Sequence, residues 1–161
     1  MCVVFETLSP ELQKAIKKRF KEPTLPQKLA IPVIASGLNT MIIAPTGAGK
    51  TETALLKIFD KIVTEKPQPI STIYITPMRA LNRDLLDRIL WWAKELELEV
   101  SVRHGDTSPY ERQLQVEFPP DVMITTLEQL QPMLTGKKLR ELLKNVKYVI
   151  LDEIHETVDS K

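Results

Sequence analysis

The segment from Ala44 to Thr51 combines the residue types that bind phosphate groups. It follows an apolar run, residues 41–44, that we expect to form a strand, and a helical pattern comes after it. In such a loop the backbone N–H groups point at phosphate oxygens, and the start of the helix adds a positive partial charge. Lys50 would reach the β- and γ-phosphates, and the hydroxyl of Thr51 would bind Mg²⁺. The general pattern has glycine at the position of Ala44, and the predicted nucleotide-binding residues are Ala44, Pro45, Thr46, Gly47, Ala48, Gly49, Lys50 and Thr51.

Two carboxylates follow a second apolar run, residues 148–151, which is typical of a buried strand. Charged groups at the end of a buried strand are costly unless they have a partner or a function. Asp152 would hold Mg²⁺ opposite Thr51, and Glu153 would orient and deprotonate an attacking water. The alternative is an ordinary strand that ends in an acidic turn. The catalytic candidates are therefore Lys50, Asp152 and Glu153, with Thr51 and Asp152 as the Mg²⁺ ligands.

Helix and strand patterns alternate along the rest of the chain. Ser9-Pro10 is a typical helix start, with serine as the cap and proline at the first helical position. The alternation predicts an α/β fold with a mostly parallel sheet and helices on both of its faces. Ligands of such sheets bind at the carboxyl ends of the strands. We expect further helices over residues 27–35, 51–65, 79–96, 109–117, 127–134 and 138–144, and strands over residues 71–75, 100–103, 122–125 and 147–151.

Together, Ala44–Thr51 and Asp152–His155 resemble motifs I and II of the superfamily-two helicases, in the DExH subgroup. Alanine replaces the first glycine of the loop in that family. Pro23–Gln27 is similar to the adenine-reading Q motif, Thr76–Asn82 to motif Ia and Ile124–Glu128 to motif Ib. The features that resemble the large helicase-related (Lhr) group more narrowly are Val102–Thr107, Glu111-Arg112 and Pro119–Asp121.

The resemblance runs from about residue 20 to residue 159 and implies a RecA-like P-loop NTPase fold with ATP and Mg²⁺ as cofactors. Residues 1–161 would be the N-terminal part of the first, ATP-binding motor domain of a helicase. The implied partners are single-stranded or partly duplex DNA or RNA and a second RecA-like domain.

In this family motif III and the arginine finger come later in the chain, so we expect a fold truncated before motif III, with ATP binding but negligible turnover. Arginine fingers contribute about 10³–10⁵ in rate in related enzymes. The motif III strand normally lies between the strands of motifs I and II. We therefore expect the gap in the sheet to be managed by direct strand pairing, chain exchange or aggregation.

Several side chains have both a functional and a structural interpretation. The carboxamide of Gln27 would bind the adenine edge, or it would cap its own helix. A helix opening at Arg79 would offer N–H groups to a backbone phosphate, or would simply follow the strand. His155 would couple the ATP site to the nucleic-acid path, or it would be a structural histidine. The predicted nucleic-acid contacts, for which turns and helix caps are the alternatives, are Pro77, Met78, Arg79, His104, Gly105, Thr125 and Thr126.

Two other clusters favour structural interpretations. Trp91 and Trp92 point about 100° apart on a helix, so we expect at least one of them in the core. The basic residues fall into two groups that we expect to be solvated: Lys14, Lys17, Lys18, Arg19 and Lys21, and Lys137, Lys138 and Arg140.

The composition indicates the number of domains and the cellular environment of the protein. The 161 residues are a length typical of one domain, and the formal net charge of +1 gives no global attraction to nucleic acid. Cys2 is the only cysteine, which excludes an internal disulfide and favours a reducing environment. The sequence contains no signal-peptide pattern and no apolar run of about 18 residues. We expect a soluble cytoplasmic protein without a membrane partner.

Three alternative functions remain open at this point. One is a Ski-type DExH helicase, and a second is a catalytically incomplete ATP-binding module that regulates a partner. The third, a P-loop kinase or transporter ATPase, fits the loop at 44–51 but leaves Asp152–His155 and Thr76–Asn82 unexplained.

Overall fold

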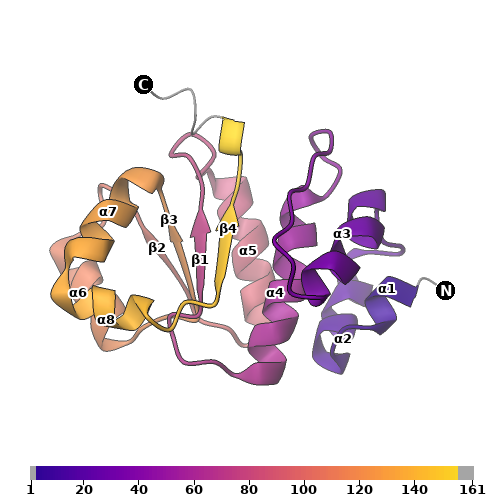
Figure 1. Ribbon diagram of the computed structural model, residues 1–161, viewed down its shortest axis with the longest axis horizontal. Helices are drawn as coiled ribbons and strands as arrows, with labels where there is room; N and C mark the ends of the chain where they lie inside the picture. The colour runs from indigo at the N-terminus through magenta and orange to yellow at the C-terminus, as the bar shows by residue number, and fades with distance from the viewer. Residues whose placement is uncertain (1–2, 156–161) are drawn as a thin grey trace. The chain divides into compact units, whose positions relative to one another are not determined.

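The computed structural model describes residues 3–155, which belong to two units that divide after Lys66 (Figure 1). The amino-terminal unit, residues 1–66, is helical in its described part. The carboxyl-terminal unit, residues 67–161, contains a four-stranded sheet and the helices that cover it.

The amino-terminal unit is built on the long helix α4 (Lys50–Glu65), which packs against α3 (Leu25–Ala35) and α2 (Pro10–Arg19). The apolar residues of α2 recur every three or four positions, so Leu12, Ala15 and Ile16 lie on one buried face. Its basic residues lie on the exposed side, as expected. The short helix α1 (Val3–Glu6) precedes α2 and was not expected from the sequence.

A buried carboxylate fixes the start of α2. Asp60, on α4, is only 3% exposed, and its Oδ1 accepts a hydrogen bond from the backbone N–H of Ser9 at 2.6 Å. The other oxygen accepts from the ammonium of Lys57 at 2.6 Å, one turn earlier on the same helix. A free N–H group at the beginning of α2 is thereby satisfied by a charged acceptor.

The prediction of a strand at residues 41–44 is wrong, because these residues form no strand in the structure. This segment is an extended loop, and Met41 and Ile43 are 73% and 89% exposed. The apolar sequence is suited to a buried strand, but a strand forms only beside a partner that hydrogen-bonds to it. The described part of the amino-terminal unit contains no sheet to provide that partner.

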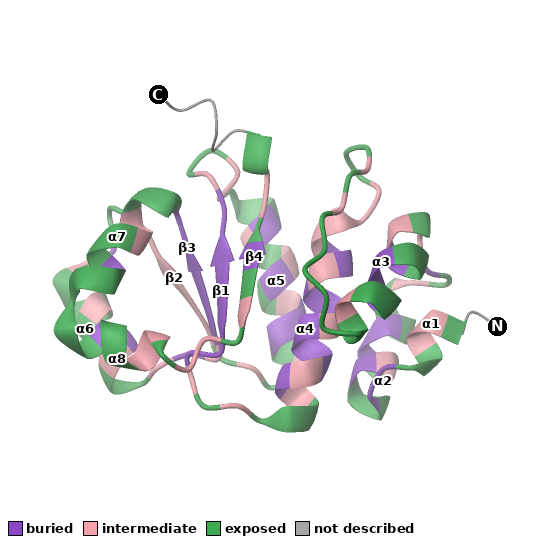
Figure 2. Cartoon of the chain, in the orientation of Figure 1, coloured by how far each residue is buried: buried purple, intermediate pink, exposed green. Residues whose placement is uncertain are grey.

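The carboxyl-terminal unit has a fully parallel sheet in the order β2-β3-β1-β4. Its strands, in chain order, are β1 (Thr72–Ile75), β2 (Val100–Arg103), β3 (Val122–Thr125) and β4 (Tyr148–Leu151). The two central strands are buried along their whole length, whereas β4 at one edge exposes Val149 and Leu151 (Figure 2). All four strands run in one direction, so their carboxyl ends lie along a single edge of the sheet.

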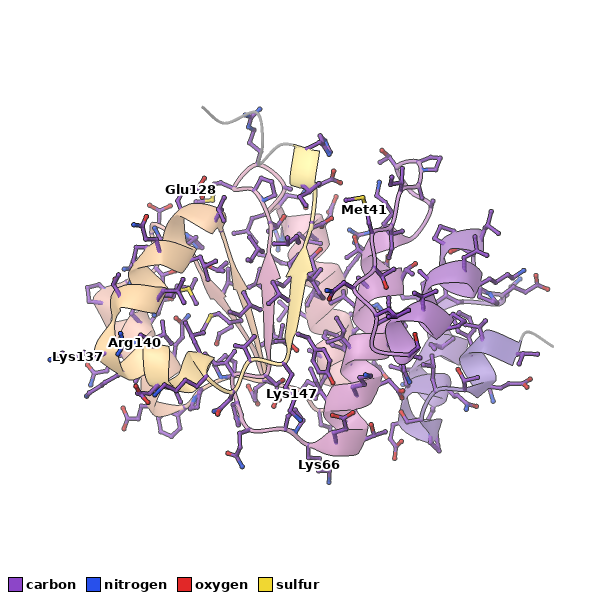
Figure 3. The ribbon with its side chains drawn as sticks, viewed as in Figure 1. Met41, Lys66, Glu128, Lys137, Arg140 and Lys147 are labelled. Carbon is purple, nitrogen blue, oxygen red and sulfur yellow. The ribbon has the colours of Figure 1, made fainter. Side chains whose placement is uncertain are left out.

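Helices cover both faces of this sheet, which confirms the expected architecture (Figure 1). The helices α7 (Leu127–Thr135) and α8 (Lys137–Leu143) pack over one face through a cluster of Ile70, Met123, Met133 and Leu139. Helix α5 (Arg83–Glu95) lies on the other side, and α6 (Pro109–Glu117) lies beside β2. Trp92 on α5 is fully buried, as expected for one of the two tryptophans. The cationic residues Lys137, Lys138 and Arg140 are exposed, and Figure 3 labels two of them on α8.

The expected start of α5 is wrong by four residues. Residues 77–81 form a turn in which the N–H groups of Ala80 and Leu81 both donate to the carbonyl of Pro77. The helix begins at Arg83 because Asn82 caps it, its side-chain oxygen accepting from the N–H of Leu85 at 2.9 Å. Helix α3 also begins two residues before its expected position. The remaining expected helices and strands agree with the structure to within one or two residues at each end.

Replacing Asp60 with alanine should lower the free energy of unfolding by about 3 kcal/mol, because it leaves the Ser9 N–H and the Lys57 ammonium without their acceptor. Urea denaturation of the two proteins measures the difference. The matched control is Glu22→Ala, which removes an exposed carboxylate. Equal stability of the Asp60 and Glu22 variants would show that the buried carboxylate does not hold α2 in place.

Candidate nucleotide and nucleic-acid sites

The loop at residues 44–51 has the backbone of a phosphate-binding loop. Gly47 and Gly49 adopt φ angles of +80° and +83°, a left-handed conformation that glycine reaches without strain. The N–H of Ala48 closes a turn on the carbonyl of Pro45 at 3.2 Å. The first hydrogen bond of α4 runs from Thr53 to Gly49, so the three N–H groups before Thr53 have no acceptor within the helix. The N–H groups of a first helical turn lie at the positive end of the helix, where anions such as phosphate bind.

Lys50 and Thr51 occupy the first turn of α4. The ammonium of Lys50 donates to the carbonyl of Ala44 at 2.9 Å, so its side chain spans the loop from one end to the other. Thr51 is half-buried on the same turn. The predicted nucleotide-binding loop, Ala44 to Thr51, therefore leads directly into the first turn of α4.

Gln27 lies against this loop and caps its own helix. Its Oε1 accepts from the N–H of Thr24 at 2.9 Å, and the side chain is fully buried. A methyl group at Gly49 would lie 3.5 Å from both Gln27 Nε2 and Thr24 Oγ1, which shows how closely the two segments approach. Among the described residues Gln27 Nε2 has no hydrogen-bond partner. The capping interpretation agrees with the structure, and adenine contact stays a prediction.

Asp152 follows β4 and is held at three points. Its backbone N–H donates to the carbonyl of Ile75 at 2.8 Å, which continues the ladder between β1 and β4. Its Oδ1 accepts from the N–H of Glu153 at 3.0 Å, and its Oδ2 accepts from the hydroxyl of Tyr74 at 2.5 Å. Sequence reasoning did not identify Tyr74. The signal was present, since Tyr74 on β1 and Asp152 after β4 fall on the same face once the two strands are paired in parallel.

Glu153 and His155 contact each other at the same strand end. The backbone of Glu153 has a φ of +46°, and its Oε2 lies 3.4 Å from the Nδ1 of His155. The carboxylate is one third exposed and the imidazole is 72% exposed. Glu153 is therefore accessible to a water molecule, and His155 is close enough to respond to its charge.

The halves of the predicted ATP site belong to different units, so the structure describes each on its own. Lys50 and Thr51 lie in the amino-terminal unit, whereas Asp152 and Glu153 lie in the carboxyl-terminal unit. Among the described residues no three histidine, cysteine or acidic side chains form a metal-binding group. None of the described helices is both long and apolar enough to span a bilayer.

The predicted nucleic-acid residues lie at the carboxyl ends of three neighbouring strands. Pro77, Met78 and Arg79 follow β1, and the last two are exposed in the turn before α5. The helix begins at Arg83, so no helix start lies at Arg79, and the N–H groups of Ala80 and Leu81 donate to the Pro77 carbonyl. His104 and Gly105 follow β2, in a loop where the N–H of His104 donates to Thr107 Oγ1 at 2.9 Å.

Thr125 and Thr126 end β3 and are both buried. The hydroxyl of Thr125 donates to the carbonyl of Arg103 at 2.9 Å and so ties β3 to β2. Thr126 occupies the cap position of α7, without a capping bond from its side chain. The Thr125 hydroxyl is directed into the protein, and contact of either hydroxyl with nucleic acid stays a prediction.

The loop at residues 104–107 is held by one arginine of α6. Arg112 donates to the carbonyls of Thr107, Gly105 and His104 at 2.8, 3.2 and 3.4 Å. Ser108 and Glu111 start this helix, since the Ser108 hydroxyl and N–H both donate to Glu111 Oε2 at 2.7 and 2.8 Å. These bonds hold the pKa of Glu111 below its usual value. The sequence showed Glu111 and Arg112 only as a family feature, and the structure shows what they do.

Next to this loop, the side chain of Gln115 joins α6 to the edge strand β2. Its Nε2 donates to the carbonyl of Val102 at 2.8 Å, and its Oε1 accepts from Arg103 at 3.3 Å. Burial, and then the positive charge of Arg112, lower the pKa of Arg103 from its usual value.

Replacing Arg112 with alanine should increase amide hydrogen exchange in residues 105–107 by at least about tenfold, because each bond to a charged donor contributes about 1.5–3 kcal/mol. The matched control is Gln113→Ala, its exposed neighbour on α6. Unchanged exchange in the Arg112 variant would show that the loop is ordered by its own turn alone.

Comparison with known families identifies the chain. Residues 24–161 match the family model described as DEAD/DEAH box helicase. The chain belongs to this helicase family. It is 40% identical to the ATP-dependent helicase Lhr-Core of Sulfolobus acidocaldarius, over 98% of this chain and 20% of that protein. It is 34% identical to the Lhr helicase/uracil glycosylase of Escherichia coli, over 97% of this chain and 11% of that protein. The predicted resemblance to the Lhr group is confirmed.

Solved structures agree on the fold. Mycobacterium smegmatis helicase Lhr, bound to single-stranded DNA and AMP-PNP, superposes with a TM-score of 0.85 at 34% identity, over 95% of this chain and 21% of that one. The DEAD-box helicase Mss116, bound to single-stranded RNA and UDP-BeF, superposes with a TM-score of 0.83 at 23% identity, over 95% of this chain and 32% of that one. The predicted RecA-like α/β fold is confirmed. The chain spans about a fifth of the length of the Lhr-Core relatives it matches.

Proposed function

We propose that residues 1–161 belong to the first, ATP-binding motor domain of an ATP-dependent nucleic-acid helicase. The observation that carries the proposal is the loop at 44–51, with its two left-handed glycines and with Lys50 at the start of α4. A helix start with converging N–H groups and a lysine binds a triphosphate through its charge and its shape. For a full-length protein as long as the Lhr-Core relatives, we propose that ATP hydrolysis drives movement along a nucleic-acid strand.

Each residue of the two halves has a role in this proposal. Lys50 binds the β- and γ-phosphates, and Gln27 contacts the adenine. Thr51 and Asp152 fit Mg²⁺, because a hydroxyl and a carboxylate are the hard oxygen ligands that this ion takes. When bound, the ion neutralises charge that develops on the phosphate oxygens. Glu153 accepts the proton of the attacking water, and His155 beside it couples this step to the nucleic-acid path.

The partners are single-stranded or partly duplex DNA or RNA and a second RecA-like domain. The support is the shared edge of the sheet, where the turn at 77–79 follows β1 and the loop at 104–107 follows β2, with β3 between these two strands. The exposed Arg79 side chain suits phosphate oxygens there. The Lhr and Mss116 structures, bound to DNA and RNA respectively, support a single strand as the ligand.

Replacing Glu153 with glutamine tests the proposed chemistry in the full-length protein. Loss of a general base lowers the rate of ATP hydrolysis by about 10²–10⁴. Binding of a fluorescent ATP analogue should be retained, since the carboxamide keeps the size of the side chain. Glu117→Gln, an exposed position on α6, is the matched control. Nucleic-acid-stimulated hydrolysis that persists in the Glu153 variant would exclude Glu153 as the base.

A further inference from the structure

Tyr74 is a large polar side chain buried completely in the middle of the sheet. It lies on the central strand β1, and its phenol is 0% exposed. A buried phenol hydroxyl requires a hydrogen-bond partner, and Tyr74 donates to the Oδ2 of Asp152. The partner is therefore the carboxylate that the proposed function assigns to Mg²⁺.

The strand register explains why these two residues meet. Tyr74 pairs with Ile150 in the parallel ladder between β1 and β4. Asp152 lies two residues beyond Ile150, so it projects on the same face of the sheet as Tyr74. The backbone bond from the Asp152 N–H to the carbonyl of Ile75 fixes the residue in this register. The contact thus follows from the sheet, and it does not depend on a flexible loop.

The two bonds to Asp152 leave its carboxylate able to bind a cation. Oδ1 accepts from the Glu153 N–H and Oδ2 accepts from the Tyr74 hydroxyl. An ionised carboxylate has about four acceptor positions, so each oxygen keeps one. The two donors restrict rotation of the carboxylate plane and hold its remaining acceptor positions in one direction. Hydrogen bonds of this kind orient metal-binding carboxylates in general.

We propose that Tyr74 is a positioning residue that holds Asp152 in the orientation in which it binds Mg²⁺ of a magnesium–nucleotide complex. This inference rests on the proposed function, because it needs Asp152 to be a Mg²⁺ ligand. Tyr74 itself touches neither the nucleotide nor the ion. Its contribution is the direction of the carboxylate and the low cost of ordering it when the ion binds.

The test is Tyr74→Phe in the full-length protein, which deletes only the hydroxyl. Loss of such an outer partner lowers metal affinity by about 10–100-fold. The Mg²⁺ concentration that gives half-maximal binding of a fluorescent ATP analogue should therefore rise at least about tenfold. Binding of the same analogue in EDTA should equal that of the wild type. Tyr110→Phe is the matched control, because its ring is 70% exposed at the start of α6.

A structural role alone would give a different result. Measurements are made well below the melting temperature of each variant, so that the same fraction of protein is folded. A Tyr74→Phe protein with a lower melting temperature but the Mg²⁺ dependence of the wild type would overturn the proposal. The proposal also fails if analogue binding weakens equally with and without Mg²⁺.

Asp152→Asn separates this inference from the proposed function. In that background the additional Tyr74→Phe change should leave the Mg²⁺ dependence where Asp152→Asn alone puts it, since the carboxylate it orients is gone. If Asp152→Asn alone does not change the Mg²⁺ dependence, the assignment of Asp152 as a ligand is wrong, and the inference falls with it. If Asp152→Asn abolishes the dependence and Tyr74→Phe has no effect, only the role of Tyr74 is wrong.

Discussion

The parallel pairing of β1 with both β3 and β4 is the constraint on which the proposed chemistry depends. It places the residues after each strand on one edge of the sheet, although they are up to about 75 positions apart in the chain. The same register brings Tyr74 under Asp152 and puts the turn at 77–79 between neighbouring strand ends. The hydrogen bonds of the ladder are not chemically special, but they decide which side chains can act together.

The phosphate-binding loop and the helix start at Lys50 depend on residues that are close together in the chain. These residues favour the geometry, because Gly47 and Gly49 permit the left-handed backbone and the helical pattern begins directly after them. The segment of Gln27 packs against this loop within the same unit. A nucleotide-binding loop can therefore be ordered by contacts near it in the chain, whereas the acidic half of the site requires a complete strand ladder.

This difference explains how much could be predicted from the sequence. Most helices and all four strands of the sheet were expected, since periodicity, Ser9-Pro10 and the glycines act over a few residues. Residues 41–44 were expected as a strand because their composition suits one, but pairing is a property of two segments. The start of α5 was missed since a turn on the Pro77 carbonyl competes with the helix for the same N–H groups. The contact between Tyr74 and Asp152 joins residues far apart in the chain and depends on the assembled sheet, so no local pattern indicates it. The bonds from Arg112 to residues 104–107 are local, but an arginine in a helical pattern does not indicate which carbonyls it will bind.

The side chain of Gln115 covers part of one edge of the sheet. Among the described strands β2 pairs only with β3, and the Glu99 carbonyl faces β3, so the carbonyl of Val102 faces away from the sheet. The side-chain N–H of Gln115 donates to that carbonyl, as a backbone N–H of an added strand would. This side-chain bond therefore blocks the pairing of a further strand beside β2 at Val102.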